Sequence, residues 1–291
     1  MTHHTSRARL RAILAGQECH MMATVFDPIS SRIAEDLGYK AALMGGSLIS
    51  HFVLGAPDVN VLTLTDVAEH VWRCTRVSEV PLLVDADDGY GNALNVMRTV
   101  QELDRAGAAG IKIEDTALPR AYGSSGAPAL LSREESADKL RAAVKARGDS
   151  DMLVLGRTNA SAIVDVDEAI VRYKAFEAAG VDALFIPRPK SREQLDRIAA
   201  AVKLPLVLGG SGDPLRDPQY LASRGVRLWS PGHHVVRLAV QTLYDGMKAV
   251  HEGVPPEKLP GMPSSEALLD RMLRTDEYGE ATRDFLGAPR Q

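Results

Sequence analysis

The stretch Pro81-Leu82-Leu83-Val84-Asp85-Ala86-Asp87-Asp88-Gly89-Tyr90-Gly91-Asn92 passes from an apolar run directly into three acids and two glycines. A helical pattern begins at Ala93, so the stretch predicts a buried strand, a tight acidic turn and a helix. Carboxylates clustered at a strand end are hard oxygen ligands, which suit Mg²⁺ or Mn²⁺ rather than zinc. Taken alone, such a stretch is more often a strand followed by a solvated acidic turn, so the rest of the chain decides.

The same alternation of strand and helix recurs along the chain. Several helical patterns stop at a glycine just before the next apolar run, as at Gly107 and Gly180, where glycine is the expected helix cap. Eight short apolar strands that alternate with helices predict a (β/α)8 TIM-type barrel. No G-x-G-x-x-G follows the first strand, which argues against a dinucleotide-binding sheet. The predicted strands are 23–27, 41–47, 81–87, 110–115, 152–159, 183–188, 205–210 and 227–230.

The end of the chain has a different composition. We expect residues 1–252 to form the barrel and residues 253–291 to form a proline-rich linker with a C-terminal helical extension. The segment from Ser264 to Leu273 reads as a helix with an apolar face. A helix that follows a completed barrel has to bury that face, and a neighbouring subunit is a reasonable place for it.

Composition limits the class of protein. The chain has 291 residues, a net charge of −4 and no long basic run, so nucleic acid and anionic membranes are unexpected partners. Its apolar runs are too short to span a bilayer, and the first ten residues lack a signal-peptide core. Cys19 and Cys74 form neither a disulfide framework nor a metal motif. We therefore expect a cytoplasmic protein.

In a (β/α)8 barrel, the active site lies at the carboxyl ends of the strands. The acids there can hold a divalent cation, partly through water, and Arg157 can grip a carboxylate in fork geometry. Ser47 and the amides around Gly46 can bind a second anionic oxygen. The strand ends carry Asp27, Gly46, Ser47, Asp85, Asp87, Asp88, Glu114, Asp115, Arg157, Asn159, Arg188, Gly232 and His233.

Each of these residues also has a simpler interpretation. Asp27 can cap the helix from Ser30, and Arg157 can pair with Glu114 only to stabilise a layer of the barrel. His233 can be a neighbour of a helix N-terminus, and Ser47 can be a turn residue. The set is more informative than its members, because strand ends rarely collect so many ionisable groups for packing alone.

Five segments in order give a resemblance to a known family: Gly45-Gly46-Ser47, Ala56-Pro57-Asp58, Asp85 to Gly91, Ile113-Glu114-Asp115 and Gly156-Arg157-Thr158-Asn159. Together they resemble the isocitrate lyase/phosphoenolpyruvate mutase superfamily over residues 26–244. The resemblance implies an α/β barrel whose last helix is exchanged between subunits, and usually a homotetramer built as a dimer of dimers. It also implies an α-keto acid substrate bound through Mg²⁺, with Mn²⁺ as the alternative ion.

Departures from the family pattern indicate a branch. The lyases carry a Lys-x-Cys-Gly-His-type loop after strand four, but here Tyr122 and Ser124 stand where the cysteine and histidine would be. The Lys-Thr-Asn-Ser-like loop of the phosphonate enzymes is also absent. The segments around Ile113 to Pro119 and Asp88 to Val100, with Gly232-His233, most resemble the oxaloacetate decarboxylase branch. The run after strand seven lacks a tyrosine expected in that branch.

This resemblance implies a carboxy-lyase that converts oxaloacetate, or a close β-keto acid, to pyruvate and CO₂ through a metal-stabilised enolate. It assigns the metal to Asp85, and our own hypothesis adds Asp87 and Glu114 as the acids that hold the metal's waters. Gly46, Ser47, Arg157 and His233 are then the substrate-binding residues, and Asp58, Arg157 and His233 the catalytic ones.

Two alternatives remain open at this point. One is a different enzyme on the same site, which hydrolyses phosphonopyruvate, rearranges phosphoenolpyruvate or cleaves a larger 2-hydroxy acid. The other is a non-catalytic barrel that binds a dicarboxylate.

The connection from Leu48 to Val61 is longer than the usual two to six residues, which suggests a functional loop. It leaves the same strand end as Ser47 and contains Asp58. We expect it to be a lid that closes over the bound ligand and excludes water.

Overall fold

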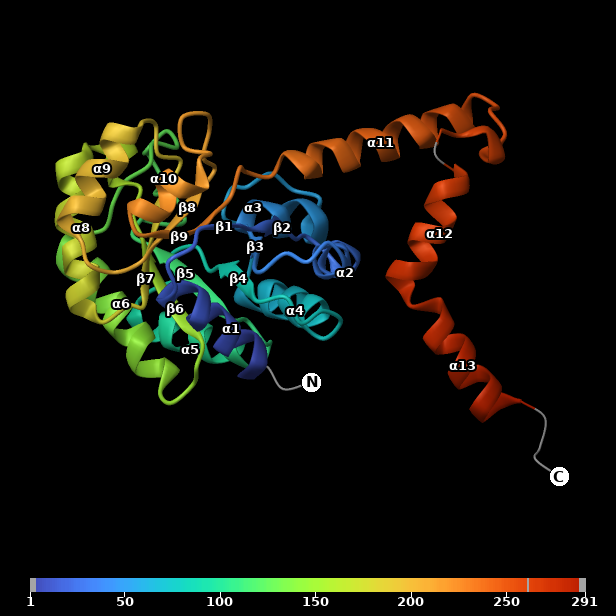
Figure 1. Cartoon of the computed structure of the whole chain (residues 1–291). Coiled ribbons are helices and arrows are strands. Elements are labelled where there is room, and N and C mark those ends of the chain that lie inside the picture. The colour runs from blue at the N-terminus through green and yellow to red at the C-terminus, as the bar shows by residue number, and fades with distance from the viewer. Residues whose placement is uncertain (1–3, 261, 288–291) are drawn as a thin grey trace. The chain divides into compact units, whose positions relative to one another are not determined.

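The computed structural model describes residues 4–260 and 262–287 (Figure 1). The chain forms two compact units, residues 1–232 and residues 233–291. The first unit contains the parallel sheet and the helices around it, and the second is helical. The boundary predicted at residues 252 and 253 stays a prediction.

Parallel strands close the first unit into a barrel. The strand order is β1-β9-β8-β7-β6-β5-β4-β3-β2, and every neighbouring pair is parallel. Only Met22 separates β1 from β2, so one continuous stretch pairs with β9 on one side and with β3 on the other. The predicted (β/α)8 barrel is therefore confirmed. The strands are β1 His20–Met21, β2 Ala23–Thr24, β3 Ala42–Met44, β4 Leu82–Asp85, β5 Gly110–Glu114, β6 Leu153–Arg157, β7 Ala183–Pro187, β8 Leu206–Gly209 and β9 Val226–Trp229.

Helices follow the strands around the barrel. The longer helices after the first begin where a short polar side chain at the N-cap accepts a hydrogen bond from a backbone N–H of the first turn, as Ser132 does from Glu135 (3.0 Å). The same capping role is played by Asp27, Thr63, Asn92, Asp165, Ser191 and Asp217. The helices of this unit are α1 His4–Ala15, α2 Pro28–Asp36, α3 Gly46–Ile49, the π-helix η1 Ser50–Leu54, α4 Leu64–Thr75, α5 Ala93–Arg105, α6 Arg133–Arg147, α7 Ala160–Ile163, α8 Val166–Ala179, α9 Arg192–Ala201 and α10 Pro218–Ser223.

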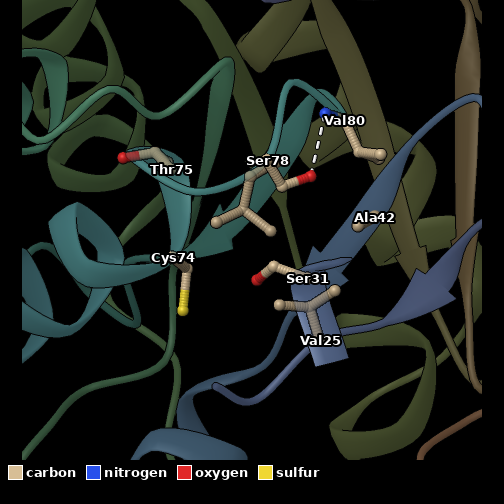
Figure 2. Close-up of a pocket in the computed structure, with 8 residues that line it drawn as sticks. Val25, Ser31, Ala42, Cys74, Thr75, Ser78 and Val80 are labelled. Carbon is tan, nitrogen blue, oxygen red and sulfur yellow. Dashed lines mark hydrogen bonds between the residues drawn. The ribbon is translucent and has the colours of Figure 1, made fainter. Parts of the chain in front are cut away.

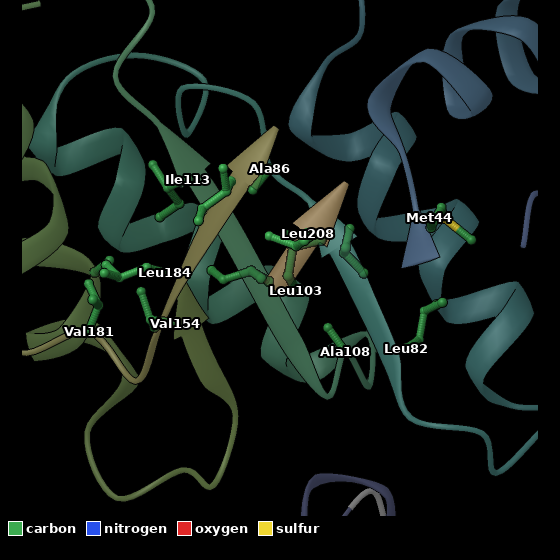
Figure 3. Close-up of a cluster of buried hydrophobic side chains, with 14 of the residues drawn as sticks. Met44, Leu82, Ala86, Leu103, Ala108, Ile113, Val154, Val181, Leu184 and Leu208 are labelled. Atoms are coloured by element: carbon green, nitrogen blue, oxygen red, sulfur yellow. The ribbon is translucent and has the colours of Figure 1, made fainter. Parts of the chain in front are cut away.

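Alternating side chains along each strand divide the hydrophobic core in two. The outward-facing set, which includes Met44, Leu82, Val154, Leu184 and Leu208, packs between the sheet and the helices (Figure 3). Residues of this set lie at almost every second position of the strands. This outer core is what fixes the helices against the barrel.

The inward-facing set fills the interior of the barrel. Leu83, Leu155 and Phe185 belong to it, together with Leu10 and Leu14 of α1. A Cβ placed on Gly110, at the start of β5, would lie 3.2 Å from Leu10, so α1 closes the amino end of the barrel. The interior is thus apolar at its amino end, which leaves the opposite end for polar groups.

The second unit consists of helices and short turns. Its longest helix carries exposed apolar side chains at Leu238, Leu243, Tyr244 and Met247. A surface of this kind suits a partner subunit, and the predicted helix exchange stays a prediction. Among the residues described, no helix is both long and apolar enough to span a membrane. The elements are α11 His234–His251, the 3₁₀-helix η2 Pro256–Lys258, α12 Met262–Leu273 and α13 Thr275–Leu286.

Candidate active site

Strand register brings four ionisable side chains to the carboxyl end of the barrel. Asp85 of β4 pairs in register with Lys112 of β5, and Glu114 of β5 pairs with Arg157 of β6. Ile111 and Ile113 pack in the outer core, so the alternating Lys112 and Glu114 point into the barrel. The apolar interior therefore ends in a layer of charge.

Opposite charges alternate within this layer. Lys112 Nζ forms an ion pair with Asp85 Oδ2, and Arg157 Nη1 lies 3.1 Å from the same oxygen. Arg157 Nη2 lies 2.6 Å from Glu114 Oε2. Asn159 Nδ2 also donates to Glu114 Oε2, at 3.2 Å. The pair of Arg157 with Glu114 is the contact that the simpler interpretation of these residues predicted.

The charges shift one another's pKa values. Burial alone would raise the pKa of Asp85, but Lys112 and Arg157 together lower it to about 2. Burial lowers the pKa of Lys112, and Arg157 adds to that effect while Asp85 opposes it. Asp85 is therefore an anion at every pH of interest.

Asp87 lies beside this layer in an unusual backbone conformation. Its φ of 44° is in the left-handed region, which is uncommon for residues other than glycine. A Cβ on Gly46 would lie 2.8 Å from Asp87 Oδ1, so glycine leaves room for the carboxyl group. Burial, followed by repulsion from Asp85 and Glu114, raises the pKa of Asp87 well above its ordinary value. Asp87 thus lies close to two other acids, and their repulsion outweighs the attraction of the nearby Lys112.

Asp58 approaches the same acids from the connection after β3. Much of that connection is helical, because α3 and η1 cover Gly46 to Leu54 before the chain turns at Gly55. Asp58 keeps much of its surface exposed to solvent. The part of its carboxyl group that is shielded from water, and then the negative charges of Asp85 and Glu114, raise its pKa. Phe52 stacks on Phe26, with ring centroids 4.4 Å apart, and ties the segment to the barrel.

The predicted anion-binding residues Gly46 and Ser47 open α3. The backbone N–H of Gly46 donates a hydrogen bond to Asp85, so this amide supports an acid in the present structure. Ser47 is half-buried next to it. Their role toward a substrate stays a prediction.

His233 is the N-cap residue of α11 and belongs to the second unit. It is half-buried. This is the helix-terminal position that the simpler interpretation described, and its proposed part in substrate binding stays a prediction.

Three acids of the strand ends have structural roles instead. Asp27 caps α2 through a hydrogen bond from the Ser30 amide. Asp88 lies 3.3 Å from Lys139 Nζ, and the buried Asp115 lies 2.9 Å from Arg172 Nη1. Asp115 follows Glu114 directly at the end of β5, so the alternation along the strand turns it away from the barrel interior. Asp88 lies in the turn after β4, where Lys139 pairs with it.

Lys112 is the member of the site that the sequence reasoning missed. It stands in an apolar run, two residues before Glu114, and therefore on the same face of β5. That spacing was available from the sequence. A lysine within a buried strand is rare enough to have marked the position.

The acids fit a divalent cation chemically. Asp85, Asp87 and Glu114 supply carboxylate oxygens, which Mg²⁺ and Mn²⁺ prefer. The raised pKa of Asp87 reflects repulsion that a bound cation would relieve. In the described residues no group of three His, Cys, Asp or Glu side chains is already spaced to hold a metal ion, and Asp85 and Glu114 pair with Lys112 and Arg157.

A small cavity elsewhere in the barrel takes no part in this arrangement. It measures about 10 Å³, which is room for a single water molecule. Val25, Ser31, Cys74 and Ser78 line it, and the Val80 amide donates to Ser78 Oγ at 3.2 Å (Figure 2). Burial raises the pKa of Cys74 to about 12, so this thiol is inert.

Comparison with known proteins agrees with this architecture. The sequence profile of the family described as phosphoenolpyruvate phosphomutase matches residues 10–251. An oxaloacetate decarboxylase of Paraburkholderia xenovorans (strain LB400) is 58% identical over 282 residues, which cover 97% of this chain and 94% of that protein. The crystal structure of phosphoenolpyruvate phosphomutase from Streptomyces platensis subsp. rosaceus superposes with a TM-score of 0.86 at 26% identity, covering 97% of this chain and 99% of that one. A phosphonopyruvate hydrolase solved with oxalate and Mg²⁺ gives a TM-score of 0.83 at 27% identity, covering 98% and 99%.

Proposed function

Because the chain belongs to the phosphoenolpyruvate phosphomutase family, within the isocitrate lyase/phosphoenolpyruvate mutase superfamily, we propose that it decarboxylates oxaloacetate, or a close β-keto acid, to pyruvate and CO₂. The observation that carries the proposal is the charged layer of Asp85, Lys112, Glu114 and Arg157, which closes an otherwise apolar barrel. The 58% identity to an oxaloacetate decarboxylase over nearly the whole chain supports the choice of substrate.

Asp85 would hold a divalent cation, with Asp87 and Glu114 beside it to bind its water ligands. Mg²⁺ is our choice, with Mn²⁺ as the alternative, and the relative solved with oxalate and Mg²⁺ supports it. The cation, when bound, supplies a Lewis acid for the negative charge that develops on the keto oxygen.

The chain's own groups then hold the keto acid in position. Arg157 supplies a fixed positive charge beside the acids and, with Ser47 and the amides at the start of α3, would anchor the carboxylate next to the keto group. His233 would orient the departing carboxylate. The carbon–carbon bond breaks with its electron pair moving toward the keto oxygen, so no protein nucleophile is required. The enolate then takes up one proton at its terminal carbon, from water once the site opens, and becomes pyruvate.

Asp58 would enter the closed site when its connection folds over the substrate. Gly55, with φ of 62°, ends η1 and marks a natural pivot. Closure would exclude water while the enolate exists.

The rival enzyme activities need groups that the chain does not supply. Tyr122, at the position of the lyase cysteine, is fully exposed. A phenol there is a poor substitute for a thiol acid, which disfavours cleavage of larger 2-hydroxy acids. The loop from Leu118 to Ser124 also lacks the pattern of the phosphonate enzymes.

We further propose that the chain works as a homo-oligomer, with a tetramer built as a dimer of dimers. The exposed apolar residues of α11 support a partner subunit. The cytoplasmic location expected from the sequence stays a prediction.

The proposed reaction can be tested with a panel of substrates. Purified protein with Mg²⁺ would be incubated with oxaloacetate, phosphonopyruvate or isocitrate, and the products followed by ¹H and ³¹P NMR. We expect product from only one of the three substrates, namely pyruvate from oxaloacetate. Inorganic phosphate from phosphonopyruvate, or glyoxylate from isocitrate, would favour another enzyme on this site, and binding of oxalate with no product from any keto acid would favour a non-catalytic barrel.

A further inference from the structure

Lys112 has an environment that barrel packing alone does not require. It is 3% exposed, and its ammonium lies 4.6 Å from the centre of the Phe185 ring. Other inward positions nearby, such as Leu83 and Leu155, are apolar. Lysine is seldom buried in proteins unless it is paired, so its partner is the key to its role.

That partner is the acid to which the metal is assigned. Lys112 Nζ forms an ion pair with Asp85 Oδ2. Arg157 Nη1 donates to both carboxylate oxygens of Asp85, at 3.1 Å to Oδ2 and 3.3 Å to Oδ1. The oxygens that a metal needs are therefore already shared between two internal cations.

Charge balance points the same way. The acids that face one another here are Asp58, Asp85, Asp87 and Glu114, against the cations Lys112 and Arg157. With every acid ionised, four negative charges meet two positive ones, and a divalent cation closes the difference. A buried excess of like charge is costly, so the internal cations hold the cluster together in the metal-free protein.

We propose that Lys112 is a positioning residue that competes with the divalent cation for Asp85. It keeps the acids in place before the metal arrives, and it weakens metal binding by drawing Asp85 toward itself. The inference rests on the proposed function in one respect only, the assignment of the metal to Asp85.

The test measures metal binding rather than turnover. Mn²⁺ would be titrated into metal-free wild type and Lys112→Met, with free Mn²⁺ followed by electron paramagnetic resonance and melting temperatures recorded with and without the ion. Methionine keeps the unbranched shape of the side chain, one atom shorter, and removes its charge. We expect Mn²⁺ to bind the variant about tenfold more tightly or better, since one positive charge leaves a buried site.

Lys112→Met should also widen the difference between the melting temperatures measured without and with Mn²⁺. Metal-free Lys112→Met should melt below the wild type, and saturating Mn²⁺ should restore most of the loss, because tighter binding adds stability to the folded state. Lys112→Arg, which keeps the charge, should bind Mn²⁺ as the wild type does.

Lys139→Met is the matched control. Lys139 is equally buried and pairs with Asp88, an acid that is not assigned to the metal. Its loss should lower the melting temperature with and without Mn²⁺ and leave the affinity unchanged. If Mn²⁺ bound more tightly to both Lys112→Met and Lys139→Met, the loss of any buried positive charge would be enough to raise the affinity. That result would overturn a specific role for Lys112.

Unchanged or weaker Mn²⁺ binding by Lys112→Met would also overturn the proposal. Should that variant fail to fold, crystal structures of the wild type with and without Mn²⁺ decide the question. The contact between Lys112 and Asp85 should open when Mn²⁺ is bound, and an unbroken contact contradicts competition. A wild type that binds no Mn²⁺ at all would instead refute the metal assignment in the proposed function.

Discussion

Replacing Arg157 by methionine tests whether one side chain serves both the fold and the site. The guanidinium lies 3.1 Å from Asp85 and 2.6 Å from Glu114, with 14% of its side chain exposed. Removing one partner of a buried ion pair leaves an uncompensated charge, which typically costs about 3–5 kcal/mol. Here Lys112 remains beside Asp85, so we expect the lower end, about 3 kcal/mol, in the free energy of unfolding of the metal-free protein.

The same variant should lose activity beyond its loss of stability. A charge-assisted contact to a substrate carboxylate contributes about 2–4 kcal/mol, so kcat/KM for oxaloacetate should fall by roughly 30- to 900-fold. Arg157→Lys keeps the charge but loses the planar fork, and should recover more stability than activity. Urea unfolding and a pyruvate-linked assay on the same preparations measure the two effects.

Arg133→Met provides the control for this experiment. Arg133 pairs with Glu168, but 49% of its side chain is exposed, so its loss should lower the free energy of unfolding much less than the loss of Arg157 does. An Arg157→Met protein as stable as this control, with kcat/KM within threefold of wild type (about 0.7 kcal/mol), would refute the reasoning about the charged layer.

Three further predictions concern other parts of the first unit. Gly46→Ala would place a Cβ 2.8 Å from Asp87 Oδ1 and so displace this carboxyl group. The affinity for Mn²⁺, measured by titration, should fall at least about tenfold while the melting temperature changes little. An unchanged affinity would show that Asp87 does not lie next to the metal. Hydrogen bonds from Arg133 and Arg172 lower the pKa of Glu168 to about 2 from its ordinary 4.5. The ionised Glu168 therefore stabilises the folded protein above pH 4.5, and this contribution is lost as the pH falls toward 2. Glu168→Gln should flatten the dependence of the free energy of unfolding in urea on pH over that range, and an unaltered slope would contradict the shift. Limited proteolysis near Gly55 should slow when Mg²⁺ and oxalate are both present, whereas equal cleavage in both states would argue against a lid.

The fold could be predicted because local signals agreed along the chain. Apolar runs, polar N-caps such as Ser132 and glycine stops such as Gly180 all indicated the same alternation, and the structure has its strands and helices at those places. The exceptions lie where tertiary packing decides. Gly46 and Ser47 were expected to end a strand and the segment from Leu48 to be a loop, but residues 46–54 are helical, and Phe52 stacks on Phe26, a contact between residues far apart in sequence.

The candidate site could be predicted less completely. Glu114 and Asp115 are adjacent in sequence, yet one faces Arg157 in the barrel and the other faces Arg172 outside it. The acids were found because they stand at strand ends. Lys112 was missed because its partner Asp85 lies on another strand, and only the register between β4 and β5 brings the two together.

The helix after the barrel illustrates a different limit. The sequence indicated a helix from Ser264 to Leu273, but a further helix, Thr275–Leu286, was not expected. Its sequence contains Gly279, which lowers helix propensity, although its apolar residues do gather on one face.

The central claim is that the acids at the carboxyl end of the barrel hold the cation on which turnover depends. Its most direct test is a parallel measurement of Mn²⁺ binding and of pyruvate formation from oxaloacetate in wild type and Asp85→Asn, with the metal-only reaction subtracted. We predict one tightly bound Mn²⁺ per wild-type chain and turnover above the metal-only rate, both of which disappear in the variant. An Asp85→Asn protein that still binds Mn²⁺ and forms pyruvate at a rate near that of wild type would contradict the account.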